Sequence, residues 1–363
     1  MPQDAIESGK SNDNVPATPI LEYEVDLSYV QNVQAEAAKC ELDVRLPAQR
    51  QRNRFSPVLI SVIKNERHRL ERFVTHHRDR GVQEFVFIDN GSTDDSLSWL
   101  RAQPDVLALT VDRPFDWQAK QGWITHVINK IGRQRWFLVL DADERLVYPG
   151  EDQHDLSDLA AQMELEEIWR VRGMLIDLYG PGSLLASGTG EHRLFDGEGY
   201  ATRETYCMNS VMGGPRARAL ATPDFALQPE LTKYPLFRIG EEDLMANPHH
   251  LWPFGANYKS PCHLGLLHDK FGKDLLDKIE RAIRENSYWN GSFEYRAYRA
   301  ALQANPQLSL VYDGTRCYER PDDLVDAGLL APIDWASKRR PRWLLQARAR
   351  WSPLAVFQNR RQD

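Results

Sequence analysis

The chain has 363 residues, of which 42% are hydrophobic and 10% aromatic, enough for a buried core in one large or two modest domains. Its net charge of −7 argues against a general nucleic-acid-binding protein. Its four cysteines are far apart and form no C-x-x-C pair, which disfavours a zinc site and a dense disulfide framework. The sparse cysteines, the lack of an apolar signal-peptide region and the lack of any long apolar run together predict a cytoplasmic protein without a membrane span.

The chain from Pro57 onward alternates between buried strands and helices. Apolar, often β-branched runs predict four strands, and periodic apolar residues between them predict three helices. The strands are expected at 58–63, 84–89, 106–111 and 136–140, and the helices at 69–81, 92–100 and 117–131. Ser92, with Asp95 three residues later, has a capping-box pattern that predicts the start of the second helix. This order predicts an α/β fold with a mainly parallel sheet flanked by helices.

Three further parts of the chain differ in composition and in hydrophobic pattern. Residues 1–54 are expected to form a partly disordered N-terminal extension with a short helix near 30–38. Residues 168–180 read as a further strand and 274–289 as an amphipathic helix, with loop-rich sequence between them. We therefore expect a nucleotide-binding half at 55–178, an acceptor half at 179–320 and a C-terminal tail at 321–363. Eight Lys and Arg residues between 338 and 361 alternate with aromatic and aliphatic residues, which suits either a helix at an anionic membrane or a solvated terminal helix.

Polar residues gather where the predicted strands end, and the fourth strand runs into Asp141, Asp143 and Glu144. In parallel sheets the carboxyl ends of the strands form the ligand-binding edge. Clustered carboxylates repel one another unless a cation lies between them, and Mg²⁺ or Mn²⁺ prefers oxygen ligands while leaving positions for substrate phosphate. The alternative is that these acids cap the next turn or pair with Arg145.

Three segments in this order resemble the nucleotide-binding half of family 2 glycosyltransferases with the GT-A fold: VLISVIKNE, FVFIDNGSTDDS and VLDADERLVYPG. The resemblance covers about residues 57–320 and extends to GGPRARAL, LTKYPLFR, LGLLHDKF and YWNGSFEYRAY. It implies a metal-dependent, inverting transfer of a sugar from a UDP- or GDP-linked donor to a glycan or lipid-linked acceptor in bacterial surface-polysaccharide synthesis.

The resemblance also implies roles for individual residues. Glu66 and Asp89 would contact the nucleoside, and Asn90 and Gly91 would let the backbone approach it, with Gly91 removing a Cβ obstacle. Asp141 would face the ribose or the metal's water shell, and Asp143 would bind Mn²⁺ or Mg²⁺ directly. His268 is the first histidine candidate for the metal, ahead of His249 and His250. Phosphate contacts are predicted for Arg216, Arg218 and Lys270.

The general base is the least determined assignment. Many family 2 enzymes have an acidic pair after the metal motif, which points to Glu242 and Asp243, although the chain's nearer relatives are expected to lack acids there. Glu191, Asp196 and Glu230 remain open for this role.

Two other functions compete with glycosyl transfer. A Mg²⁺-dependent nucleotidyltransferase or phosphohydrolase would use the same acids, but a sugar nucleotidyltransferase needs a glycine-rich loop, and KNERHRLE after the first strand has no glycine. A non-catalytic scaffold on the same fold would have little reason to keep a costly cluster of like charges.

Overall fold

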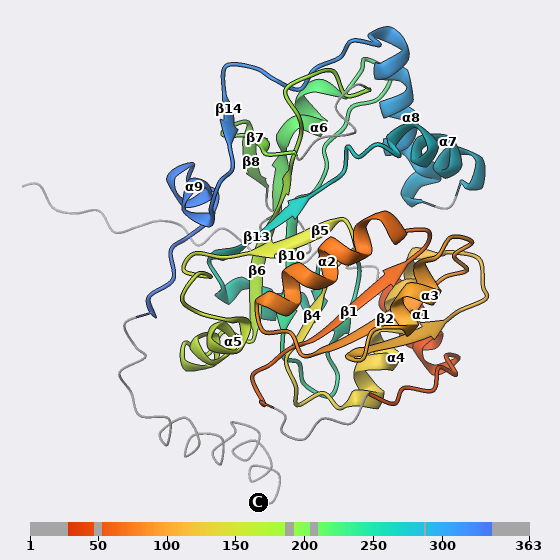
Figure 1. The fold of residues 1–363 in the computed structure, drawn as a ribbon, viewed down its shortest axis with the longest axis vertical. Coiled ribbons are helices and arrows are strands. Elements are labelled where there is room, and N and C mark those ends of the chain that lie inside the picture. Colours follow the sequence, from red (N-terminus) through yellow and green to blue (C-terminus); the bar gives the residue numbers. More distant parts are fainter. Residues whose placement is uncertain (1–27, 47–52, 186–191, 204–209, 287, 336–363) are drawn as a thin grey trace, which may run out of the picture.

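The protein is described by a computed structural model that covers residues 28–46, 53–185, 192–203, 210–286 and 288–335 (Figure 1). Its centre is an eight-stranded sheet in the order β3-β2-β1-β4-β10-β6-β13-β5. The strands of this sheet are β1 (Val58–Ile63), β2 (Glu84–Asp89), β3 (Val106–Thr110), β4 (Phe137–Val139), β5 (Glu144–Val147), β6 (Arg170–Asp177), β10 (Thr232–Phe237) and β13 (Cys262–His268). Six strands run parallel, while β10 and β5 run antiparallel to their neighbours. The fold class is therefore the mixed, mainly parallel α/β sheet that the sequence predicts.

Helices cover both faces of this sheet. Successive residues of a strand point to opposite faces, and apolar side chains occur on both faces, so each face needs a covering layer. Leu59 and Ile63 belong to a core with α2, α3 and α5, whereas Val58 and Ile60 pack toward α4 on the other face. The helix bounds are α1 (Ser28–Ala38), α2 (Arg67–Asp79), α3 (Ser96–Arg101), α4 (Trp117–Ile131), α5 (Leu156–Leu165), α6 (Gly214–Ala219), α7 (Leu275–Glu285), α8 (Trp289–Ala304) and α9 (Pro321–Asp326).

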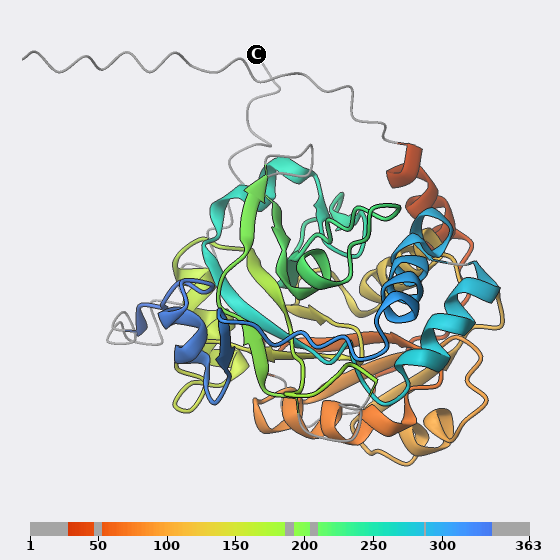
Figure 2. The same cartoon turned by 90° about the horizontal axis from the view of Figure 1, so that it is seen from above.

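A third core, separate from the sheet, joins α7 and α8, with Phe271, Ile279 and Tyr298 among its buried members. These two helices lie above the β1–β3 end of the sheet in Figure 1, and Figure 2 shows them from above. Short elements complete the structure: β7 (Leu194–Asp196), β8 (Tyr200–Arg203), β9 (Ser210–Gly213), β11 (Leu244–Met245), β12 (Leu251–Trp252), the 3₁₀ helix η2 (Phe254–Lys259) and β14 (Thr315–Cys317).

The second predicted helix begins later than its capping-box pattern indicates. Helix α3 starts at Ser96, and Ser92 does not cap it. Instead, the Ser92 hydroxyl accepts a hydrogen bond from the Asn65 amide at 2.8 Å, and the Asp89 carboxylate accepts one from the Ser92 amide at 3.1 Å. The polar side chains that suggested a helix start therefore tie the loops after β1 and β2 together.

Both ends of the described chain pack on the central body. Val30 and Val33 of α1 are buried, and the His126 ring of α4 lies against the Ala37 carbonyl at 3.3 Å. At the other end, the Trp335 indole donates to the Pro149 carbonyl at 3.1 Å. The basic part of the predicted tail, from 338 onward, lies outside the described residues, and no helix among those described is long and apolar enough to cross a membrane.

Candidate active site

The acid cluster and His268 meet because of the strand register. Asp141 and Asp143 lie in the turn between β4 and β5, and Glu144 begins β5. His268, the last residue of β13, pairs with Glu144 of β5 on one side and with Asp177, the last residue of β6, on the other. Three strand ends and one turn thus bring four acids and a histidine to the carboxyl edge of the sheet.

The carboxylates of Asp141, Asp143 and Glu144 form a tight cluster, with one oxygen of each lying within 4.8 Å of the others. Burial opposes the ionisation of Asp143, but Lys278 at 3.1 Å, together with His268, holds the pKa of Asp143 well below its usual value. Asp143 is therefore ionised at neutral pH, and its charge is balanced by nearby cations.

His268 is held between two of these acids. Its Nδ1 lies 2.6 Å from Asp177 Oδ1, and its Nε2 faces Asp143 Oδ2 at 3.6 Å. Metal-binding histidines commonly donate one ring N–H to a carboxylate, which fixes the tautomer and turns the other nitrogen to the ion. The donor set of carboxylate oxygens with one imidazole nitrogen fits a divalent ion such as Mn²⁺ or Mg²⁺.

Besides Lys278, two more lysines that sequence analysis missed pair with the acids. Lys233 of β10 lies 3.3 Å from Asp141 Oδ2 and also contacts Glu144. Lys120 of α4 contacts the other oxygen of Asp141. Burial alone would lower the pKa of Lys233, but Glu144 and Asp141 raise it above the usual lysine value, so the ammonium stays charged. Arg145, which the sequence offered as a partner for the cluster, instead lies 3.5 Å from Asp269.

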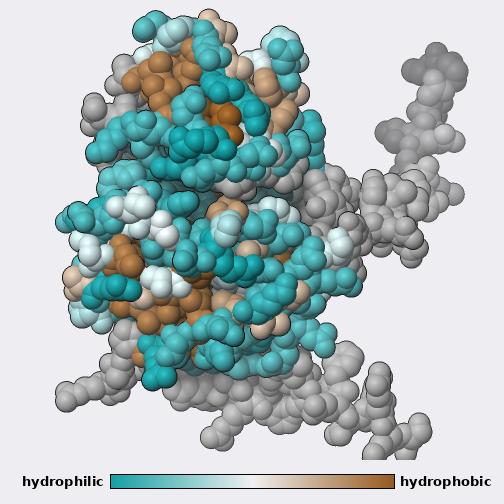
Figure 3. Space-filling model, turned by 90° about the vertical axis from the view of Figure 1, so that its right-hand side faces the viewer, coloured by the Kyte–Doolittle hydropathy of each residue, from teal (hydrophilic) through white to brown (hydrophobic). Residues whose placement is uncertain are grey.

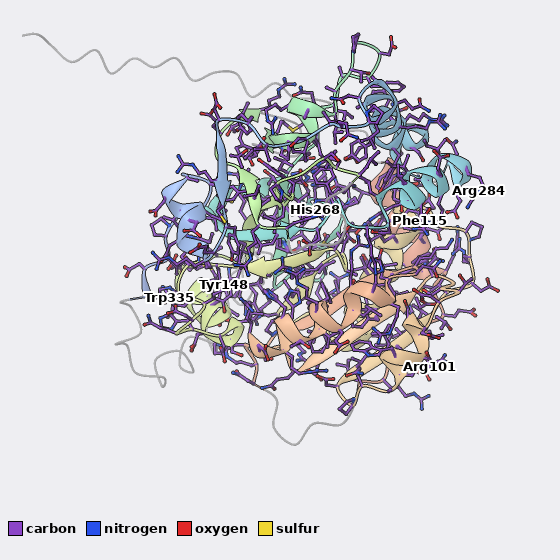
Figure 4. All side chains as sticks on the ribbon, turned by 45° about the horizontal axis from the view of Figure 1, so that its top comes forward. Arg101, Phe115, Tyr148, His268, Arg284 and Trp335 are labelled. Atoms are coloured by element: carbon purple, nitrogen blue, oxygen red, sulfur yellow. The ribbon has the colours of Figure 1, made fainter. Side chains whose placement is uncertain are left out.

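The cluster forms part of the wall of a cavity of about 970 Å³. The cavity lies between the strand ends and the helices α7 and α8, and loop 226–230 forms another part of its wall. Figure 3 shows the face that carries α7 and α8 above and α3 and α4 below, with hydrophobic side chains in both halves and hydrophilic ones between. In Figure 4, His268 lies in the interior, with Phe115 toward α7 and the Trp335–Tyr148 pair on the opposite side. The volume is that of a site for a drug-sized or nucleotide-sized ligand.

The loops after β1 and β2, which carry the predicted nucleoside-binding residues, border this cavity. Glu66 and Asn90 line it, and Glu66 is paired with Arg69 at 2.7 Å. Asp89 is buried next to Asn90, and its Oδ1 has no hydrogen-bond partner among the described residues. Gly91 has φ +73°, and a Cβ there would meet no protein atom within 4 Å. Glycine is thus favoured by the backbone conformation rather than by crowding within the protein.

Arg216 and Lys270 also line the cavity, as their predicted phosphate contacts require. The Arg216 guanidinium donates to Asp177 Oδ2 at 2.7 Å and to Glu294 Oε1 at 2.8 Å. Lys270 lies 3.8 Å from Glu294 and above the ring of Tyr295. Arg216 is therefore both a wall of the cavity and the partner of the acid that orients His268.

Four other predicted residues are not among those that line the cavity. Arg218, whose side chain is partly exposed, pairs with the buried Asp196 at 2.9 Å, and neither residue is among those that line the cavity. Asp243 pairs with Arg170 at 3.0 Å, at the opposite edge of the sheet from the acid cluster. Because β10 runs antiparallel, its first residues reach the cluster and the chain after its last residue is carried to the far edge. The position of Asp243, with its neighbour Glu242, is incompatible with a base acting at the cluster.

The remaining histidine and acid candidates occupy one corner of the cavity. His249 and Glu230 line it, and His250 is buried beside Glu230, with Nε2 3.2 Å from Glu230 Oε1. The His249 ring is held by the Thr232 carbonyl at 2.8 Å. Of the three histidine candidates, only His268 lies against the acid cluster. Glu191 falls outside the described residues.

Comparison with known proteins adds little to this description. No protein-family model matches the chain, and no curated protein sequence matches it. Among solved structures, the chain is similar to a mannosyltransferase from Pyrobaculum calidifontis in complex with GDP-Man and Mn²⁺, at 15% sequence identity. The alignment covers 77% of this chain and 82% of that one, with a TM-score of 0.29, so we draw no functional conclusion from it.

Proposed function

We propose that this protein is a metal-dependent glycosyltransferase that uses a nucleotide-sugar donor. The observation that carries the proposal is the cluster of Asp141, Asp143 and His268, with His268 oriented by Asp177, on the wall of a nucleotide-sized cavity. The resemblance of the strand-end motifs to family 2 glycosyltransferases supports the same function, with inverting stereochemistry.

The charges around the cavity suit a diphosphate. When bound, the divalent ion would be held by Asp143 and His268, with Asp141 beside it, and would supply positive charge to the leaving nucleoside diphosphate. Lys270 and Arg216 face the same space and would bind the phosphate oxygens. The loops after β1 and β2, which place Glu66 and Asn90 on the cavity wall, would hold the nucleoside.

Thermal stability in the presence of nucleotides tests this proposal. We expect UDP or GDP to raise the melting temperature of the wild type only when Mn²⁺ or Mg²⁺ is present, because ligand that binds the native state alone stabilises it. Asp143→Ala should abolish the metal-dependent rise, whereas Glu242→Gln, at the far edge of the sheet, should keep it. If no nucleotide stabilises the wild type with either metal, the scaffold function is the better account.

The nucleotidyltransferase alternative is distinguished by its products. A nucleotidyltransferase releases pyrophosphate from a nucleoside triphosphate and a sugar 1-phosphate, whereas a glycosyltransferase releases a nucleoside diphosphate from a nucleotide sugar. Release of UDP or GDP from the donor that stabilises the protein is the expected result. Pyrophosphate release would favour the alternative.

We further propose a lipid-linked or glycan acceptor and contact of the basic C-terminal segment with an anionic membrane. Eight basic residues alternate with apolar ones between 338 and 361. Liposome flotation of a protein truncated after Trp335 tests the contact, because Trp335 packs on His154 with ring centroids 4.0 Å apart and would be kept. Equal flotation of the full-length and truncated proteins would exclude it.

A further inference from the structure

Glu230 differs from every other carboxylate on the described cavity wall. Each of the others lies within 4 Å of a Lys or Arg side chain, which stabilises its ionised form and satisfies its charge. Those paired carboxylates are Glu66, Asp141, Asp143, Glu144, Glu285 and Glu294. Among the residues that the structure describes, no such cation lies within that distance of Glu230, so its proton affinity is set mainly by burial.

The contacts of Glu230 leave one oxygen free. Oε1 accepts a hydrogen bond from the Ser210 hydroxyl and lies 3.2 Å from His250 Nε2. Oε2 has no partner among the residues that the structure describes, and the side chain is 28% exposed. The carboxylate is thus fixed through one oxygen, while the other is accessible to a ligand in the cavity.

The histidine beside Glu230 is neutral. Burial lowers the pKa of His250 to about 4, helped by the charge of Arg172. A neutral imidazole with its proton on Nε2 can donate to Glu230 Oε1 without neutralising the carboxylate. Burial, with a contribution from the charge of Glu230, raises the pKa of the Tyr234 hydroxyl to about 12, so this group too is uncharged.

Burial raises the pKa of Glu230 to about 7, and the Ser210 hydroxyl only partly opposes this rise. A general base works best when its pKa lies near the operating pH. Glu144 also has a raised pKa because it is buried, but one of its oxygens contacts Lys233 and the other accepts from the Asp141 amide at 3.2 Å, so no oxygen of Glu144 is free.

We propose that Glu230 is the general base that accepts the proton of the acceptor hydroxyl, with Oε2 as the accepting atom. The inference rests on the proposed glycosyl transfer. As the acceptor oxygen forms its bond to the anomeric carbon, the bond between that carbon and the phosphate oxygen breaks and its electron pair leaves with the nucleoside diphosphate. The hydroxyl proton moves to Glu230, which later releases it to water.

The position of Glu230 suits this role. It immediately precedes Leu231 and β10, and Lys233, three residues further on, reaches the acid cluster. The apolar side chains of Ala226, Leu227, Pro229 and Met212 form the cavity wall near it, where the acceptor would enter. Glu230 therefore lies on the same edge of the sheet as the metal ligands, unlike Glu242 and Asp243.

Azide rescue tests the proposal, because azide is an anionic nucleophile that needs no deprotonation. The probes are UDP-glucose and GDP-mannose with Mn²⁺, and the donor used is the one whose nucleoside diphosphate stabilises the wild type. We expect Glu230→Ala to lower release of nucleoside diphosphate by about 10²- to 10⁴-fold. Sodium azide should restore it at least about tenfold and yield a glycosyl azide of inverted configuration.

Two further variants separate a base from a structural residue. Glu230→Gln keeps the shape of the side chain, so it should keep the metal-dependent stabilisation by nucleotide and lose both turnover and the fall of kcat/KM below about pH 7 that the wild type shows. Glu285→Ala removes a cavity carboxylate that is paired with Lys64, and it should show no dependence on azide.

The outcomes distinguish the two proposals. If the wild type neither binds nucleotide with metal nor releases nucleoside diphosphate, the proposed function fails and the inference fails with it. If the wild type binds and turns over but Glu230→Gln retains turnover, or Glu230→Ala forms no glycosyl azide, Glu230 is not the base and the proposed function stands.

Discussion

Asp177 orients His268, and replacing it with Asn should weaken metal binding specifically. Asp177 is buried, with Oδ1 2.6 Å from His268 Nδ1 and Oδ2 2.7 Å from Arg216 Nε. An amide of the same shape can accept a hydrogen bond at only one of these positions. Loss of a carboxylate that orients a metal-binding histidine typically costs 10- to 100-fold in metal affinity. We expect the Kd for Mn²⁺ of Asp177→Asn to rise by about that factor.

The same change should also lower stability, because it leaves buried cationic groups without their charged partner. Breaking such a pair costs about 3–5 kcal/mol. A chain of 363 residues unfolds with an entropy of about 0.76 kcal/mol/K, so the melting temperature should fall by about 4–7 °C. Burial would raise the pKa of Asp177, but Arg216 and His268 hold it at about 2, below its usual 3.8. Its stabilisation is therefore present above about pH 4 and lost as the pH falls toward 2, and pH 7.5 suits the measurement.

Asp196→Asn is the matched control for the loss of stability. Asp196 is fully buried and accepts two hydrogen bonds from Arg218, each at 2.9 Å, but it lies behind the cavity wall. We expect a similar fall in melting temperature with an unchanged Kd for Mn²⁺, measured from the electron paramagnetic resonance signal of free Mn²⁺. An unchanged Kd in Asp177→Asn, or an equal rise in both variants, would refute the orienting role of Asp177.

Three other substitutions have distinct expected results. Lys278→Met removes the ammonium 3.1 Å from Asp143. The metal-free protein should therefore melt at a lower temperature, and Mn²⁺ should raise its melting temperature more than that of the wild type. Differential scanning fluorimetry with and without Mn²⁺ measures both effects, and an unaltered Mn²⁺ effect would contradict the pairing. Asp243→Asn breaks the pair with Arg170 at the far edge of the sheet, so the stability of the protein should fall. The kcat for nucleoside diphosphate release should stay within about twofold of the wild-type value. A loss of kcat by about 100-fold or more would instead support Asp243 as the general base. Gly91→Ala places a side chain on a residue with φ +73°, which should cost about 1–2 kcal/mol of stability. No steric clash adds to this cost, and chemical denaturation measures the loss. Unchanged stability would mean that the loop after β2 relaxes to another conformation.

The sequence alone predicted the class of fold that the structure shows and the strand ends at which the candidate site lies. Four apolar runs separated by periodic helices are local patterns, and they predicted the parallel strands and the edge at which their polar ends meet. Local sequence also indicated that Asp141 and Asp143 end a strand, and the family resemblance selected His268, which the register of β13 places beside Asp143.

Only the tertiary structure decided which distant residues complete the site. Asp177, Lys233 and Lys278 received no role from the sequence, and they reach the cluster because β6, β10 and α7 converge on one edge of the sheet. The sequence pointed to Asp243 because its acidic neighbourhood is a local signal, whereas the antiparallel course of β10, which carries it to the far edge, is not. Glu230 stands out only when every cavity carboxylate is seen with its cation, since the pKa of a buried acid depends on neighbours that are distant in the sequence.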